Sequence, residues 1–130
     1  MPSGSRLQPI VPEGVVPLAP YSPAIAAAGL VFVSGQVPVD EHGGVVGDGI
    51  EAQTRRTFAN LQTVLRAAGC ELSDVVSVTS YLVDAADFEG FNAVYQEVFA
   101  PPYPARATVL AGLLAPGVRV ESSAIAVRQS

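Results

Sequence analysis

The stretch from Asp48 to Val83, DGIEAQTRRTFANLQTVLRAAGCELSDVVSVTSYLV, predicts a helix followed by a strand, and this pair decides the fold. The first half carries a helical repeat of apolar and small side chains at Ile50, Thr54, Phe58, Leu61, Val64, Leu65 and Ala68. Asp48 and Glu51 have the spacing of a capping box, and Gly69 is typical of a helix end. From Asp74 to Val83 the chain is rich in Val, Ser, Thr and Tyr, which favours a strand.

The same two kinds of pattern continue on both sides of this stretch. Further strands are expected at Ala24 to Ala28, Leu30 to Ser34, Arg106 to Leu110 and Arg119 to Val127. A second helix is expected after Asp84, with Phe88, Phe91, Val94, Tyr95 and Val98 on its apolar face. The order is β-β-α-β-α-β-β in one domain over residues 1–130, in which the proline-rich residues 1–20 are expected to form an extended, partly mobile arm.

Two amphipathic helices each need an apolar surface to cover. The economical arrangement is an α+β fold, in which a single sheet carries both helices on one face. The opposite face of the sheet would then be bare unless other copies of the chain cover it. Only 15% of the residues are charged, against a typical value of about 25%. Both observations predict a homo-oligomer.

Composition excludes several classes of function. The net charge is −5 and the chain has no lysine, which disfavours nucleic-acid binding and excludes Schiff-base catalysis. Cys70 and His42 are the only cysteine and the only histidine, so neither an intrachain disulfide nor a multi-histidine metal site is expected. No apolar run reaches the roughly 18 residues of a membrane span, and the N-terminus does not resemble a signal peptide. A soluble cytoplasmic protein is the default expectation.

Two charged residues lie in short apolar runs that favour strands. Arg106 lies in YPARATV, residues 103–109, and Glu121 lies in GVRVES, residues 117–122. An arginine holds a carboxylate through two parallel hydrogen bonds, and a partly buried glutamate can exchange protons. On neighbouring strands the pair could fix an anionic substrate and manage a proton. The structural alternatives are a surface position or ion pair for Arg106, and a salt bridge from Glu121 to Arg119.

Four other residues are candidates of lower specificity. Tyr21 can stack on a planar ligand or donate a hydrogen bond to it, and Ser34 with Gly35 can bring backbone groups close to a substrate. Asn92 can reach a ligand from the middle of the second helix. The corresponding structural roles are packing for Tyr21, a bulge or turn at Gly35, and a solvent-facing position for Asn92.

Taken together, these segments resemble the RidA family, also called the YjgF/YER057c-like proteins, from about Pro20 to Arg128. The matching pieces are residues 19–22 (APYS), 33–38 (VSGQVP), the helix from Gln53 to Leu61, Asp87-Phe88, 92–95 (NAVY), 104–106 (PAR) and Val120-Glu121. The resemblance implies a chorismate-mutase-like fold with a single mixed sheet. It also implies a homotrimer whose sheets form a barrel and whose sites lie in clefts between subunits.

The resemblance further implies hydrolysis, without metal or cofactor, of reactive enamines and imines such as 2-aminoacrylate and 2-iminopropanoate, which yields the 2-oxo acid and ammonia. Arg106 would hold the substrate carboxylate, and Glu121 would deprotonate a water or relay a proton to the departing amine. The cleft would be lined by Tyr21 from a neighbouring subunit, by Ser34 and Asn92, and by backbone groups around Gly35 and Thr108.

The sequence departs from the family pattern at three positions. Thr108 stands where several members have cysteine, Ser122 where an aliphatic residue is common, and Ser123 where some have an acid. Two alternatives remain open: an endoribonuclease that inhibits translation, which the acidic charge disfavours, and a trimeric small-molecule binding protein without turnover.

Overall fold

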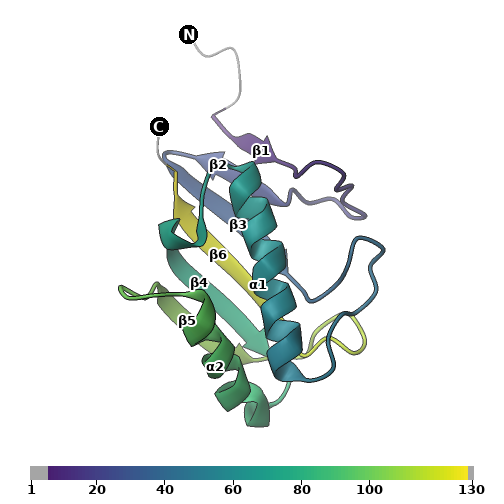
Figure 1. The fold of residues 1–130 in the computed structure, drawn as a ribbon. Coiled ribbons are helices and arrows are strands. Elements are labelled where there is room, and N and C mark those ends of the chain that lie inside the picture. The colour runs from purple at the N-terminus through teal and green to yellow at the C-terminus, as the bar shows by residue number, and fades with distance from the viewer. Residues whose placement is uncertain (1–5, 129–130) are drawn as a thin grey trace.

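The computed structural model describes residues 6–128, and in this part of the chain one sheet of six strands carries two α-helices on one face (Figure 1). The strands are β1 (Gln8–Ile10), β2 (Ala24–Ala27), β3 (Leu30–Gln36), β4 (Val75–Leu82), β5 (Ala105–Leu110) and β6 (Val120–Val127). The helices are α1 (Ile50–Ala67) and α2 (Phe88–Val98), and the short 3-10 helices are η1 (Leu72–Asp74) and η2 (Ala85–Asp87). The expected α+β architecture is confirmed.

The strand order in the sheet is β1-β2-β3-β6-β4-β5. β4 and β5 are parallel, and the other neighbours are antiparallel, so the sheet is mixed as expected. Parallel neighbours need a crossover, and α2 supplies it between β4 and β5. The last strand, β6, is inserted between β3 and β4, so it separates the two halves of the chain and leaves β5 at an edge.

Part of the proline-rich arm belongs to the sheet. Gln8–Ile10 forms β1, which pairs antiparallel with Ala24–Ala26 of β2. The expected order therefore gains one strand at its start. Ile10 reaches the core and is buried, which gives this short edge strand an apolar anchor. Residues 1–5 of the arm lie outside the described residues.

The helix predicted from the first apolar repeat is present, but its N-terminus is built differently. Phe58, Leu61 and Leu65 are fully buried in the core, as the helical spacing requires. The N-cap is Gly49, which has φ 96° and no side-chain cap hydrogen bond, so the predicted capping box of Asp48 and Glu51 is wrong. The left-handed backbone at Gly49 turns the chain sharply before the first helical residue.

The two faces of the sheet differ in what covers them. Alternate residues of the central strands, such as Val31, Val78 and Val120, are fully buried beneath the helices. α1 packs over β3 and β6, and α2 lies beside α1 toward the β5 edge (Figure 1). The other face, here called the open face, exposes 43% of Phe32 and 43% of Val76. This agrees with the expectation that one face of the sheet is left uncovered in a single chain.

Candidate functional site

Arg106 is the second residue of β5, and it projects from the helix-covered face at the edge of the sheet. It pairs in register with Val78 of β4, whose side chain is fully buried on that face. The carbon Cζ of its guanidinium lies 4.7 Å from the ring centre of Tyr95, 5.7 Å from that of Phe88 and 5.8 Å from that of Phe91. Among residues 6–128, no acidic side chain forms an ion pair with Arg106. The positive charge of Arg106 is therefore not neutralised by an ion pair within the described residues.

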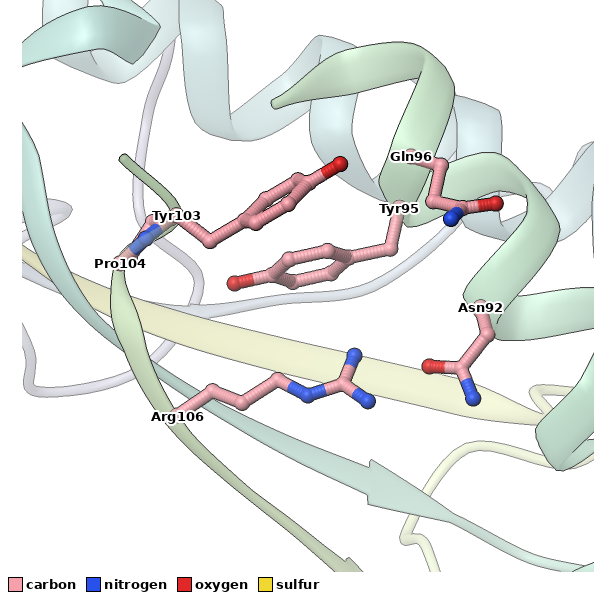
Figure 2. A pocket seen from close by; sticks show the side chains of 6 residues that line it. All are labelled: Asn92, Tyr95, Gln96, Tyr103, Pro104 and Arg106. Atoms are coloured by element: carbon pink, nitrogen blue, oxygen red, sulfur yellow. The ribbon is translucent and has the colours of Figure 1, made fainter. Parts of the chain in front are cut away.

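A pocket of about 380 Å³ opens next to this guanidinium. It is lined by Asn92, Tyr95, Gln96, Tyr103, Pro104 and Arg106. Figure 2 shows the Asn92 amide and the Arg106 guanidinium beside each other, one projecting from α2 and the other from β5. A guanidinium edge and an amide can together hold a carboxylate, which accepts hydrogen bonds only.

Tyr95 forms one wall of the pocket. Its side chain is only 4% exposed, and its hydroxyl has no hydrogen-bond partner among the described residues. Burial raises the pKa of the Tyr95 hydroxyl, because it disfavours the phenolate, and the nearby Arg106 acts in the opposite direction. The phenol is therefore neutral near pH 7.

Thr108 lies on the same face of β5 as Arg106, two residues further along. Its hydroxyl oxygen Oγ1 is buried and has no partner in the described part of the chain. In register beside it on β4 is Ser80, whose Oγ lies 2.7 Å from Oγ of Ser122 on β6. Three hydroxyls thus line up across the sheet beneath the helices, starting at the arginine pocket.

Glu121 projects from the open face. Its neighbours in β6, Val120 and Ser122, are fully buried on the helix-covered face, and strand residues alternate between faces. The carboxylate lies over Gly35, where an added Cβ would stand 2.9 Å from Cδ of Glu121. Gly35 is thus the residue that leaves room for this carboxyl group.

The salt bridge from Glu121 to Arg119, which was the structural alternative for Glu121, does not form among the described residues. Arg119 instead pairs with the buried Asp87, through an Nη2–Oδ1 distance of 2.6 Å and an Nε–Oδ2 distance of 3.0 Å. Asp87 precedes α2, so this pair ties the start of the helix to the residue before β6. The Glu121 carboxylate is therefore not engaged by this arginine.

Ser34 precedes Gly35 in β3, and a hydrogen bond links it to the segment that follows Tyr21. The hydroxyl of Ser34 donates a hydrogen bond to the carbonyl oxygen of Ser22 at 2.6 Å, and this contact fastens the segment after Tyr21 to β3. Tyr21 itself is 53% exposed. Tyr21 can therefore meet a ligand or another chain, whereas the Ser34 hydroxyl is already committed to the backbone.

The candidate residues thus form two groups rather than one site. Arg106, Asn92 and Thr108 make up the arginine group, and Glu121 with Gly35 makes up the carboxylate group. The expectation that Arg106 and Glu121 lie on neighbouring strands is wrong, because β4 separates β5 from β6. Their partners on β4 are Val78 and Tyr81, three residues apart, so the two side chains leave opposite faces of the sheet.

The aromatic side of the arginine group is not predicted by the sequence pattern. Tyr95, with Phe88 and Phe91, was assigned only to the apolar face of a helix, and the spacing alone gave no reason to set it apart. The described residues hold no group of three or more His, Cys, Asp or Glu side chains that could bind a metal. Within residues 6–128 there is also no helix long and apolar enough to cross a membrane.

Residues 13–128 match a protein-family model described as Endoribonuclease L-PSP. The 3-aminoacrylate deaminase RutC of Acinetobacter baylyi is 42% identical over 90% of this chain and 94% of its own length. The human 2-iminobutanoate/2-iminopropanoate deaminase is 33% identical over 85% of this chain and 82% of its own length. A crystal structure of RidA from an Antarctic Psychrobacter superposes with a TM-score of 0.85 at 33% identity, covering 92% of this chain and 98% of that one.

Proposed function

The chain belongs to the family described as Endoribonuclease L-PSP, the RidA family that its sequence resembles, and from this premise we propose that it hydrolyses small carboxylated enamines or imines. Both named relatives act on short molecules that carry a carboxylate and an enamine or imine nitrogen. The observation that carries the proposal is Arg106, which has no ion-pair partner in the described chain and lines a pocket with Asn92. This arrangement suits a carboxylate ligand.

The reaction needs one water and no redox partner. Water adds to the carbon of the C=N bond and gives a carbinolamine, a proton moves from the added oxygen to nitrogen, and the C–N bond breaks to release ammonia and the 2-oxo acid. An enamine first takes a proton at its β carbon and gives one up from nitrogen to become the imine. Since the imine is already electrophilic, the protein supplies mainly orientation and proton transfer. In this proposal Arg106 holds the carboxylate, and Glu121 accepts the proton from water and returns it to nitrogen.

A site that uses both residues requires more than one chain. Arg106 and Glu121 leave opposite faces of the sheet, so in this proposal Arg106 of one chain works with Glu121 of another. We propose a homotrimer with sites in the clefts between subunits, which would cover the exposed apolar side chains of the open face. Tyr21, Ser34 and Gly35 would then join Glu121 on one wall, while Asn92 and Thr108 join Arg106 on the other.

A second candidate function comes from the description of the family, which names an endoribonuclease. The net charge of −5 and the absence of lysine disfavour a surface that binds phosphates. Retention on heparin at low salt, together with RNA cleavage that copurifies with the protein through several columns, would favour this alternative over imine hydrolysis. Tight binding of 2-oxo acids without any hydrolysis would favour a binding protein.

The test of the proposal is the variant Arg106→Ala, assayed with 2-iminopropanoate generated in situ by an amino-acid oxidase. We expect a loss of hydrolysis of at least 100-fold, because the loss of a charged hydrogen-bond pair and of orientation costs several kcal/mol. Arg55→Ala is the matched control, since Arg55 is an exposed arginine paired with Glu97 on the helices. Undiminished turnover by Arg106→Ala, in a protein of unchanged mass and circular dichroism, would contradict the assignment.

A further inference from the structure

The aromatic side chains of α2 form a row that faces Arg106. Phe88, Phe91 and Tyr95 are spaced by three and four residues, so they share one face of the helix. The guanidinium carbon lies within 6 Å of all three ring centres, at 5.7, 5.8 and 4.7 Å, which is the range of a cation–π contact. Tyr95 is the closest of the three rings.

Tyr95 is itself held firmly in place. Its ring centre lies 4.7 Å from that of Phe99, 5.8 Å from that of Phe58 and 5.9 Å from that of Phe91, and all four rings are buried in the core. The ring is therefore a fixed surface. Arg106 by contrast is exposed on an edge strand, and its long side chain has many rotamers. Holding it in one rotamer costs conformational entropy, which contact with a fixed surface can offset.

We propose that the Tyr95 ring is a positioning element, which covers one face of the Arg106 guanidinium and holds its N–H edge toward Asn92, ready for a planar carboxylate. The substrate in this inference is the carboxylated imine of the proposed function, on which it rests. A ring over the face leaves the N–H groups in the plane free, and those groups form the two parallel bonds to a carboxylate. Figure 2 shows the Tyr95 ring beside the outer part of the Arg106 side chain, whose guanidinium points toward Asn92.

The positioning effect comes from the Tyr95 ring and not from its hydroxyl. The Tyr95 hydroxyl is buried and has no hydrogen-bond partner among residues 6–128, so no contact between the described residues depends on it. Tyr95→Phe keeps the ring and removes only this hydroxyl, and Tyr95→Leu removes the ring. Phe99→Leu is the matched control, because Phe99 is buried in the same cluster and packs on Tyr95 but is not one of the three described rings that the Arg106 guanidinium lies over.

The measurements are KM and kcat for 2-iminopropanoate, and the Kd for 2-oxobutyrate, a stable carboxylate, by calorimetry. For Tyr95→Leu we expect KM and Kd to rise about 3- to 5-fold, the upper range for a cation–π contact of an exposed guanidinium, with a smaller change in kcat. For Tyr95→Phe and Phe99→Leu we expect changes in KM and Kd below about twofold, although Phe99→Leu lowers the melting temperature. Tyr95→Met, which also lacks a ring but adapts to irregular space, replaces Tyr95→Leu if that variant does not fold.

Several outcomes would overturn the positioning role. An unchanged Kd for 2-oxobutyrate in Tyr95→Leu would overturn it. A rise of this Kd in Phe99→Leu equal to that in Tyr95→Leu would also overturn it, because it would mean a general loss of packing. If Tyr95→Phe weakened binding as much as Tyr95→Leu, the hydroxyl and not the ring would be responsible for the effect. Wild-type protein that binds 2-oxobutyrate but hydrolyses no imine would overturn the proposed function alone, since the Kd values still decide the role of Tyr95. Wild-type protein that binds neither compound would overturn both.

Discussion

Because Gly35 has no side chain, the carboxyl group of Glu121 can lie directly against its backbone. The Glu121 carboxyl group occupies the space that a Cβ at Gly35 would need, with Cδ only 2.9 Å from that position. Gly35 is not one of the glycines with a positive φ, so its backbone conformation does not require glycine. Its role is thus steric: it lets a carboxylate of β6 lie directly on the backbone of β3.

We expect Gly35→Ala to push the Glu121 carboxylate aside and to lower kcat/KM at least tenfold, because a displacement of about 1 Å is enough to disturb catalysis. Stability should change by less than about 1 kcal/mol, since the carboxyl end of a glutamate can move and alanine is tolerated in a strand. Gly112→Ala is the control, because an added Cβ there meets no atom within 4 Å. Equal activity of both variants in the imine assay would remove Gly35 from the list of site residues.

At this scale the sequence was informative wherever a charged or polar residue broke an apolar pattern. Arg106 and Asn92 were found in this way, and both line the pocket. Tyr95 was not found, because an aromatic residue at helical spacing has the same pattern whether it fills the core or supports a cation. Only the distance from its ring to Arg106, which depends on tertiary packing, distinguishes the two roles.

At the scale of elements, the periodic patterns predicted which segments form helices and strands, but not how these begin or pair. α1 and β4 were predicted to within about one residue, because apolar periodicity follows from burial on one face. The insertion of β6 between β3 and β4 was not predictable from local pattern, since strand pairing depends on contacts distant in sequence. This insertion is why Arg106 and Glu121 are not on neighbouring strands.

Asp84 and Asp48 each precede a helical segment, and replacing each one tests whether its side chain caps that segment. Asp84 accepts a hydrogen bond from the backbone N–H of Ala86 at 2.9 Å, whereas Asp48 makes no cap hydrogen bond to α1. Asp84→Ala should therefore lower the free energy of unfolding by about 1 kcal/mol, and Asp48→Ala by less than about 0.5 kcal/mol. Urea titrations at one protein concentration measure both. A larger loss for Asp48→Ala would mean that the capping box predicted from sequence forms in solution.

For the whole molecule, the open face and the opposed directions of Arg106 and Glu121 point to the same arrangement. A single chain leaves Phe32 and Val76 exposed on the open face, and it also leaves the two charged groups on different sides of the sheet. If the β5 edge of one chain covered the open face of another, the exposed apolar side chains would be buried. The same contact would bring Arg106 of one chain near Glu121 of the other. The trimer expected from the family resemblance would have a mass of about 40 kDa, three times the 13.4 kDa of one chain.

A shared site makes a quantitative prediction about mixed oligomers. Arg106→Ala and Glu121→Ala are each expected to be inactive when assembled alone. When the two chains are refolded together in equal amounts, a cleft is intact only if the Glu121→Ala chain supplies Arg106 and the Arg106→Ala chain supplies Glu121. Random assembly places that combination at about a quarter of the clefts, so we expect about a quarter of the wild-type imine hydrolysis.

The control is a mixture of the two variants assembled separately and combined without refolding, which should be inactive as long as subunits do not exchange. Light scattering on the refolded sample verifies that its mass equals that of the wild-type oligomer. If the refolded mixture were as inactive as its parents, Arg106 and Glu121 would have to act in the same chain. The two groups could then reach one substrate only after β5 or β6 turned its side chains to the other face, which would break the register that both strands share with β4.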